Sequence, residues 1–277
     1  MPAVTAPSAE AAPCADAEVI FARGTTELPG VGPTGQAFVD SLRSHVAPKS
    51  VEVYGVDYPA TTDFPTAVQG IADARERVIT TAANCPDTKM VLGGFSQGAA
   101  VIGFLTSSVV PDGVSPLDVP APMPAEVADH VAAVALFGTP SPRFMKVLND
   151  PPVTVGPNYV AKAIDLCVDN DLVCDPTGRS FAVHNQYEQA GMVDKGAGFV
   201  AQKLQAGWAA EERDPDRPAP PTQPQPTQPP PTFSPVSGPA ATPPVQHIGA
   251  TPDTAPGPTP LPGPAAPPSA APVAPLA

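Results

Sequence analysis

The chain has 277 residues and a net charge of −13, from 14 basic and 27 acidic side chains. A chain this acidic gains no affinity from counterion release at phosphate backbones, which excludes nucleic acid as an expected partner. No run of residues approaches the ~20 consecutive apolar positions that a transmembrane helix requires, so we expect no membrane span.

Apolar runs and helical spacings alternate along the first three quarters of the chain. Short apolar runs of strand length predict five buried strands, at residues 18–22, 51–56, 89–94, 131–137 and 161–167. Apolar side chains at helical spacing predict four helices, at residues 34–46, 66–83, 97–107 and 191–208. Strands that alternate with helices are typical of βαβ units. We therefore expect an α/β fold with a central five-stranded parallel sheet covered on both faces.

Proline marks the segments outside this alternation. Residues 110–128 and 149–158 are rich in proline and predict long surface loops. Residues 214–277 hold 23 of the 43 prolines and few large apolar side chains, so they cannot bury enough surface to offset their ordering entropy. We expect an irregular segment over residues 1–13, one domain over 14–208, and a disordered proline-rich tail over 209–277. The expected role of the tail is that of a spacer or solubility element, with contact to the cell envelope as a further candidate.

The four cysteines do not have the spacing of a metal site. They are Cys14, Cys85, Cys167 and Cys174, and they form no C-x-x-C pair and have no histidine at zinc-finger spacing. An even number of cysteines without metal spacing indicates two disulfides and an oxidising compartment. Three pairings are possible, and four buried free thiols in a cytosolic protein remain the alternative.

One motif points to a nucleophile. Gly94-Phe-Ser96-Gln-Gly98 follows a predicted strand and opens a predicted helix. A sharp turn from strand to helix needs small neighbours to hold a nucleophile in a strained backbone conformation, so the pattern predicts a nucleophilic Ser96. The same turn directs helix N–H groups, starting with that of Gln97, toward developing negative charge. The alternative is an ordinary tight turn.

An activated serine needs a base, which in α/β-hydrolases is a histidine that follows the serine and an acidic residue. Of the four histidines, His45 and His130 precede the required position, and His247 lies in the predicted tail. Because His184 alone follows the last predicted strand inside the domain, we expect it to be the base.

The carboxylate that orients the base has four candidates between the serine and the histidine. Asp165 falls inside the fifth predicted strand, whereas Asp169, Asp171 and Asp175 follow it. Asp171 is favoured because it lies between the last two cysteines, where a disulfide would hold its orientation.

The second donor to an oxyanion comes, in such folds, from the loop after an early strand. Residues 23–27, with the sequence Arg-Gly-Thr-Thr-Glu, occupy this place, and Thr25 offers both its N–H and its hydroxyl. The alternative is that Thr25 and Thr26 merely cap a turn.

Together these motifs are similar to those of a known protein family. Over about residues 14–204 the chain resembles the cutinases, and it is most similar to the bacterial cutinase-like esterases. The resemblance rests on Ala22-Arg-Gly-Thr-Thr-Glu27, which matches A-R-G-[ST]-T-E, and on residues 94–98, which match G-[YF]-S-Q-G. It rests also on Asp171-Leu-Val-Cys174, which matches D-x-V-C, and on the histidine that follows it, His184. Four motifs in the correct order are far more specific than any one of them.

The resemblance implies an α/β-hydrolase-type three-layer sandwich without a large lid that hydrolyses carboxylic esters. Thr25 stands where many members have serine, and the replacement keeps both the hydroxyl and the N–H. The residues that the resemblance implies are the triad Ser96, Asp171 and His184, the oxyanion hydroxyl of Thr25, and the disulfides Cys14–Cys85 and Cys167–Cys174.

We therefore expect a secreted or cell-wall-associated serine esterase that acts on esters of apolar acids or on lipids, without a metal or cofactor. Secretion is inferred from the cysteines and the resemblance, because the first residues lack the charged start and apolar run of a signal peptide. The alternatives are a lipase or phospholipase acting on longer acyl chains, and a non-catalytic cell-surface binding or antigen protein. The residues expected to contact the acyl chain are Leu172, Val173, Phe181 and Val183.

Overall fold

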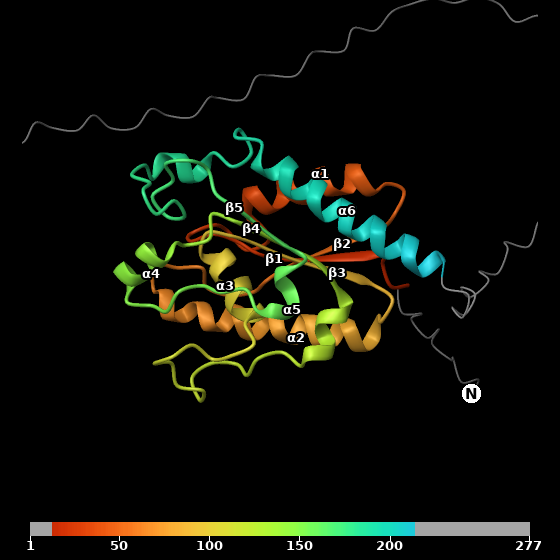
Figure 1. The fold of residues 1–277 in the computed structure, drawn as a ribbon, viewed down its shortest axis with the longest axis horizontal. Helices are drawn as coiled ribbons and strands as arrows, with labels where there is room; N and C mark the ends of the chain where they lie inside the picture. Colours follow the sequence, from red (N-terminus) through yellow and green to blue (C-terminus); the bar gives the residue numbers. More distant parts are fainter. Residues whose placement is uncertain (1–12, 214–277) are drawn as a thin grey trace, which may run out of the picture. The chain divides into compact units, whose positions relative to one another are not determined.

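The fold is built around a five-stranded parallel sheet. The structure, a computed structural model, describes residues 13–213. The strands pair in the order β2-β1-β3-β4-β5 (Figure 1). They are β1 (Ala17–Ala22), β2 (Val51–Gly55), β3 (Lys89–Phe95), β4 (Val131–Phe137) and β5 (Ala163–Leu166). All five predicted strands are confirmed, and their ends lie within two residues of those expected.

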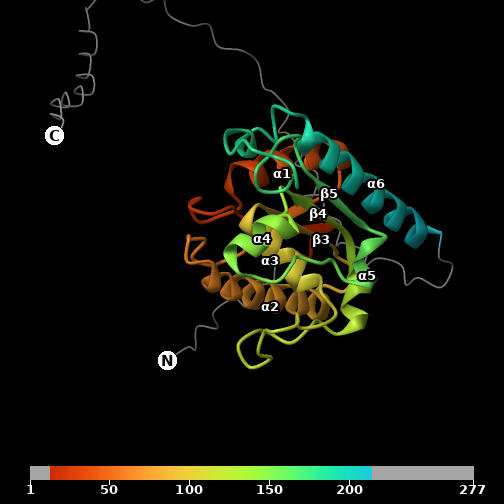
Figure 2. The same ribbon diagram turned by 60° about the vertical axis from the view of Figure 1, so that its left-hand side comes forward.

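Helices cover both faces of this sheet, which confirms the three-layer α/β sandwich. The helices are α1 (Gly32–Val46), α2 (Val68–Asn84), α3 (Gln97–Thr106), α4 (Pro142–Leu148), α5 (Pro157–Val160) and α6 (Met192–Glu212). α1 and α6 pack on one face, and α2, α3 and α5 pack on the other (Figure 1). Figure 2 shows the short helix α4 beside α3, on the side where the strands end.

Alternation along the strands divides the core into two clusters, because successive side chains of a strand point to opposite faces of the sheet. On the α1/α6 face, Phe21, Phe38 and Phe137 form an aromatic cluster with ring centroids 5.5–6.3 Å apart. On the α2/α3 face, Ile20 of β1 packs with Leu92 of β3, and both are fully buried. The central strands β1 and β3 are thus largely apolar on both sides, as expected for a covered parallel sheet, whereas the edge strand β2 exposes Glu52.

Three segments differ from the sequence-based expectations. Residues 110–128 are not loop throughout, because a 3-10 helix, Ala125–His130, begins within them and buries Val127 in the core. Residues 149–158 end in α5, which begins at Pro157, a first helical position where the missing N–H costs no hydrogen bond. Helix α4 has no predicted counterpart.

The last helix extends beyond residue 208, where the sequence pattern predicts its end. Helix α6 continues to Glu212, because residues 209–212 are alanine and glutamate, which favour helix, and because Glu211 forms a salt bridge with Lys89. Residues 1–12 and 214–277, including His247 and most of the predicted tail, lie outside the described residues.

The four cysteines pair into two disulfides, as the resemblance implied. Cys14–Cys85 links the residues before β1 to the end of α2, and Cys167–Cys174 closes the loop after β5. Among residues 13–213, no helix combines the length and hydropathy needed to cross a membrane.

Candidate active site

The sheet order determines where a site forms. Because β1 and β3 are neighbours, the strand order reverses between them, and in open α/β sheets ligands bind at such a switch point, beyond the carboxyl ends of the strands. The residues that follow these two strands are the loop of residues 23–27 and Ser96. The fold therefore brings the predicted oxyanion loop and the predicted nucleophile together.

Ser96 occupies a strained turn between strand and helix. Strand β3 ends at Phe95 and α3 begins at Gln97, so Ser96 alone makes the turn, with φ 55° and ψ −117°. This conformation is costly for a residue with a Cβ and is retained where function or packing demands it. Glycine is required on both sides, because a Cβ at Gly94 would lie 2.3 Å from the Gly98 carbonyl oxygen and a Cβ at Gly98 2.0 Å from that of Ala22. The Ser96 hydroxyl is thereby presented at the edge of the sheet.

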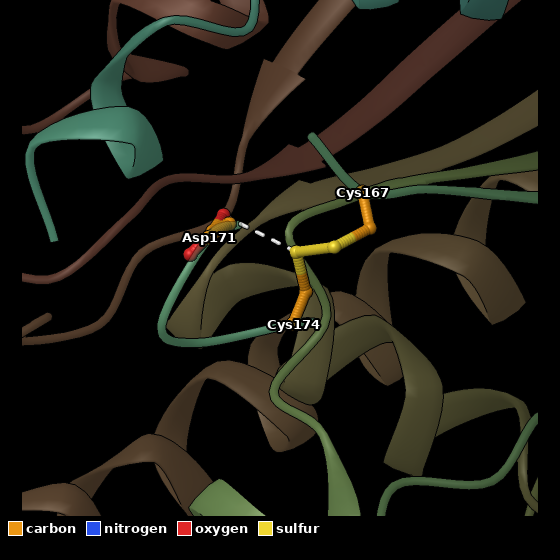
Figure 3. Close-up of side chains that lie close together, drawn as sticks. All are labelled: Cys167, Asp171 and Cys174. Carbon is orange, nitrogen blue, oxygen red and sulfur yellow. Dashed lines mark hydrogen bonds between the residues drawn. A yellow bond between two sulfur atoms is a disulfide. The ribbon is translucent and has the colours of Figure 1, made fainter. Parts of the chain in front are cut away.

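The loop after β5 holds Asp171 between the two cysteines of a disulfide. Figure 3 shows Asp171 pointing toward Cys174, whose Sγ lies 3.2 Å from Oδ2 of the carboxylate. These three side chains have the composition of a metal site, but the two sulfurs are bonded to each other and are not thiolates. The disulfide instead restricts the conformation of the loop that carries Asp171.

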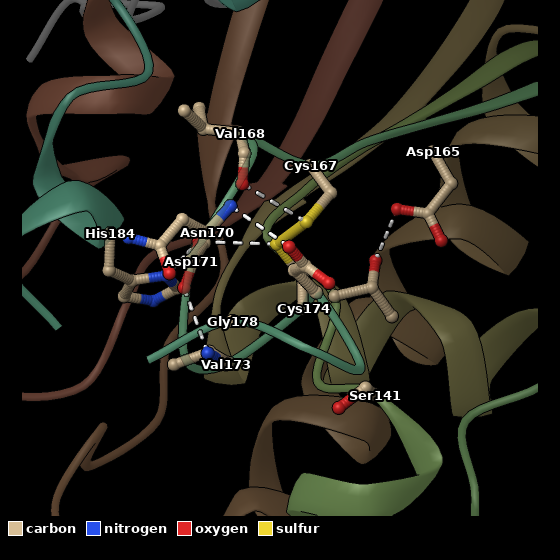
Figure 4. Close-up of a disulfide and its surroundings, with 12 residues drawn as sticks. Ser141, Asp165, Cys167, Val168, Asn170, Asp171, Val173, Cys174, Gly178 and His184 are labelled. Atoms are coloured by element: carbon tan, nitrogen blue, oxygen red, sulfur yellow. Dashed lines mark hydrogen bonds and ion pairs between the residues drawn. A yellow bond between two sulfur atoms is a disulfide. The ribbon is translucent and has the colours of Figure 1, made fainter. Parts of the chain in front are cut away.

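Asp171 is completely buried, and its carboxylate accepts hydrogen bonds from three groups. Oδ1 accepts from the Val173 N–H at 2.8 Å, and Oδ2 accepts from the Tyr187 hydroxyl at 2.8 Å. His184 Nδ1 lies 2.7 Å from the same Oδ2 (Figure 4). Burial alone would raise the pKa of Asp171, but the hydrogen bonds from His184, Val173 and Tyr187 outweigh it and hold that pKa below its usual value. Asp171 is therefore a carboxylate at neutral pH.

His184 is held with one nitrogen free. It lies in the 3-10 helix Ala182–Asn185 and is 3% exposed, and its ring stacks on that of Phe95, with centroids 4.9 Å apart. Phe95 directly precedes Ser96, so the stacking places the imidazole beside the nucleophile turn. Among the described residues, Nε2 of His184 has no hydrogen-bond partner although it is buried. An unpaired buried nitrogen on a ring oriented by a carboxylate is the arrangement of a general base.

The other aspartates bond elsewhere. Asp165 accepts a 2.8 Å hydrogen bond from Thr139 and lies on the far side of the disulfide from His184 (Figure 4). Asp175 accepts from the backbone N–H groups of Asn170 and Thr177, within its own turn, and Asp169 is exposed. Of the four candidates, Asp171 is the one bonded to His184.

The loop after β1 is rigidly held. The Arg23 guanidinium donates to the backbone carbonyls of Glu27, Val56 and Tyr58, at 2.9, 3.2 and 2.5 Å. The Glu27 carboxylate accepts from the Gly24 N–H at 2.7 Å. Burial raises the pKa of Glu27, and the Gly24 N–H and the Arg23 charge oppose this shift. These bonds leave Thr25 between two anchored residues.

Thr25 and Gln97 border the same cavity as Ser96. As the first residue of α3, Gln97 has an N–H without an intrahelical acceptor, and the positive end of the helix dipole lies there. Its side chain does not interfere, because Nε2 donates to the Thr61 carbonyl at 3.0 Å. The structure thus places Thr25 and Gln97 beside Ser96 on one cavity wall, and their role as oxyanion donors stays a prediction.

A cavity of about 500 Å³ opens at Ser96 and is mainly apolar. Val173 and Phe181 line it, as predicted, but Leu172 and Val183 do not. Residues 172–174 form a turn, closed by a 3.0 Å hydrogen bond from the Asp175 N–H to the Asp171 carbonyl, and the successive side chains of Leu172 and Val173 leave this turn in different directions. Phe181 and His184 are three residues apart in a 3-10 turn and share a face, their ring centroids 5.6 Å apart, whereas Val183 points elsewhere.

Residues 13–204 match the model of the Cutinase family. The chain belongs to this family. The probable carboxylesterase Culp5 of Mycobacterium tuberculosis is 59% identical over 167 residues, which are 60% of this chain and 95% of that protein. The phospholipase Culp4 of the same organism is 42% identical over 203 residues, 73% of this chain and 84% of that protein. As a cutinase-family protein, the chain is a carboxylic ester hydrolase.

Solved structures agree with the fold. A Trichoderma reesei cutinase in complex with a phosphonate inhibitor has a TM-score of 0.54 and 31% identity, and the match covers 69% of this chain and 78% of that one. An acetylxylan esterase has a TM-score of 0.57, with 24% identity over 69% of this chain and all of that one, which supports the fold alone.

Sequence reasoning missed two residues of this cutinase site. Tyr187 bonds to Asp171, and nothing in its sequence context distinguishes it from an ordinary core tyrosine. Phe95 supports the His184 ring, and its place before the nucleophile was a usable indication, because the side chain of that residue must lie beside the turn. Arg23 belonged to a recognised motif, but its role as the clamp of the loop required the structure.

Proposed function

We propose that the protein is a secreted serine esterase that hydrolyses esters of apolar acids through an acyl-enzyme intermediate. Ser96 is the nucleophile, His184 the general base and Asp171 the residue that orients the base. The observation that carries the proposal is the buried, unpaired Nε2 of His184, on a ring that bonds to Asp171 and stacks beside the Ser96 turn.

In the proposed reaction, Ser96 Oγ attacks the ester carbonyl carbon while its proton passes to His184 Nε2. The carbonyl electron pair moves onto the oxygen, and Asp171 stabilises the imidazolium that forms. The tetrahedral intermediate then expels the alcohol, which takes the proton from His184. Water repeats the sequence on the acyl-enzyme and releases the acid and Ser96.

Thr25 and Gln97 are the proposed oxyanion donors. The loop of residues 23–27 is held by Arg23 and Glu27, and the Gln97 N–H lies at a helix amino terminus, so both donors are oriented before the reaction begins. By analogy with other oxyanion holes, the loss of one such donor lowers kcat by about 10²–10³-fold.

Secretion or attachment to the cell wall is supported by the two disulfides, because disulfides persist in oxidising compartments. Apolar acids are supported as the acyl group by the apolar cavity that opens at Ser96. Because one relative is named a phospholipase, we also propose lipid esters as a second class of substrate for this protein.

A fluorophosphonate probe tests the proposal. The wild type is expected to be labelled, and the Ser96→Ala variant is not. Ser44→Ala is the matched control, because Ser44 is an exposed serine on α1, away from the site, and this variant is expected to be labelled like the wild type. Failure to label a folded wild type, or labelling that persists in Ser96→Ala, would contradict the nucleophile assignment.

A further inference from the structure

We infer that the cavity beyond Ser96 is a channel for the acyl chain, walled by α2, α3, α4 and residues 107–122, and that it selects esters of unbranched acyl chains of about ten carbons. This inference rests on the proposed function and adds a substrate class and the residues that select it. Val173 and Phe181, two of the residues predicted to contact the acyl chain, line the same cavity.

Helix α3 forms one wall along its whole length. The lining residues are Gln97, Ala100, Val101, Phe104 and Leu105. Their spacing of three and four residues places them on one side of the helix, so the cavity follows the helix axis away from Ser96. From residue 97 to residue 105 the axis rises about 12 Å. An extended alkyl chain has carbon–carbon bonds of about 1.5 Å and advances about 1.25 Å per bond, so roughly ten carbons match this length.

Helix α2, residues 107–122 and helix α4 supply the remaining walls, α4 through Phe144, Met145 and Leu148. Val68, Ile71 and Arg75 share one face of α2 and line the cavity. The segment opposite contributes mainly valines and prolines, which are Val109, Val110, Pro111, Val114, Val119, Pro120 and Pro122. Proline has no backbone N–H. A wall rich in proline therefore has few N–H groups that would lose their hydrogen bonds to water when an alkyl chain covers them.

The segment is attached to the body of the protein. Arg75 Nε donates to the Ala121 carbonyl at 2.9 Å, which joins α2 to residues 107–122 across the channel. The polar donors proposed for the oxyanion, Thr25 and Gln97, lie where the cavity meets Ser96. A substrate whose carbonyl occupies that end therefore has an apolar path of defined length for its chain.

Each methylene group buried from water gives about a fourfold gain in binding when burial is complete. We therefore expect kcat/KM of the wild type for p-nitrophenyl esters to rise from two to about ten acyl carbons, by roughly two- to fourfold per added carbon, and then to level off or fall. A flat or decreasing series from two carbons onward would overturn the channel.

A pair of variants in the same segment localises the effect. Val119→Trp fills the channel and is expected to lower the ratio of kcat/KM for the decanoate to that for the butyrate by tenfold or more. Leu117→Trp is the matched control, because Leu117 is 96% exposed and does not line the cavity, and its ratio is expected to equal that of the wild type. Equal ratios for all three proteins would overturn the assignment of residues 107–122 as a wall.

Labelling separates this inference from the proposed function. p-Nitrophenyl alkylphosphonates with butyl and decyl chains react with an activated serine and need no deacylation. If neither compound labels a folded wild type, the assignment of Ser96 as the nucleophile is contradicted. Labelling by both at the same rate would leave the serine in place and overturn the channel, whereas faster labelling by the decyl compound, reversed by Val119→Trp, supports it.

Discussion

The Tyr187 hydroxyl donates to Oδ2 of Asp171, the carboxylate oxygen that also bonds to His184. Burial, together with the hydrogen bond and the charge of Asp171, raises the pKa of Tyr187, so the hydroxyl remains a donor throughout the working pH range. Tyr187 is completely enclosed, and its ring contacts those of Phe95 and His184. It therefore positions the carboxylate that orients the proposed base.

Tyr187→Phe removes this donor and keeps the ring. We expect kcat to fall about tenfold with KM nearly unchanged, because Asp171 loses one of the bonds that hold its orientation. The melting temperature should decrease by an amount that corresponds to about 1–3 kcal/mol, the cost of a lost hydrogen bond to a buried charge. Steady-state kinetics and thermal unfolding check both. A change in stability with kcat intact would show that Tyr187 is structural only.

Asp171 should make stability depend on pH in the acid range. Its pKa is lowered in the folded state, so its contribution is complete above the unfolded value of about 3.9 and is lost as pH falls through the lowered folded value. Urea unfolding of the wild type and Asp171→Asn between pH 6 and pH 2 measures this. The difference between the two free energies of unfolding should shrink as pH falls below about 4, and a constant difference would contradict the lowered pKa.

Glu27 should act on the reaction through the Gly24 N–H. In Glu27→Ala this buried N–H loses its acceptor and the oxyanion loop loosens, so we expect kcat to fall roughly 10–100-fold, within the effect of losing an oxyanion donor. Glu27→Gln keeps an acceptor oxygen and should recover most of that loss. Comparison of kcat for the two variants checks this. Equal losses would show that the charge of Glu27, rather than its hydrogen bond, is what the site requires.

Removal of one disulfide should mainly lower stability, and removal of the other should mainly lower activity. In the chain-entropy model, Cys14–Cys85, with a sequence separation of 71, contributes about 4.4 kcal/mol, and Cys167–Cys174, with a separation of 7, about 2.5 kcal/mol. Replacing the first pair by serine should lower the melting temperature more and leave kcat nearly unchanged below it. Replacing the second should lower kcat strongly, because that bond restricts the Asp171 loop. Thermal unfolding and ester hydrolysis of both double variants provide the comparison.

Buried strands and the nucleophile turn were predictable from the sequence because each depends on local composition. Strands β1, β3 and β4 are short, mostly apolar runs, and the turn at Ser96 requires glycine at positions 94 and 98. Helix α4 could also have been predicted from the sequence, since Ser141 caps its first turn and Asn149 ends it in the left-handed conformation. Those two residue types are regular indications of helix ends.

The remaining features depend on contacts between distant segments. Whether Leu172 or Val173 faces the cavity depends on the orientation of the turn at residues 171–175, which backbone hydrogen bonds to Ser141 and Ser180 fix. The pairing of Tyr187 with Asp171 and the position of residues 107–122 against α2 are tertiary contacts without a local pattern. Sequence reasoning therefore identified the polar residues that the fold brings together better than the surfaces around them.

The salt bridge between Lys89 and Glu211 has a practical consequence. Lys89 is the first residue of β3 and Ser96 follows its last, so the end of α6 lies about 20 Å from Ser96, at the opposite end of the strands. A bead, an electrode or a fused partner attached at residue 213 would therefore lie at the end of the sheet opposite Ser96. The reacting edge would point outward, toward an insoluble polyester or a lipid droplet supplied in the surrounding medium.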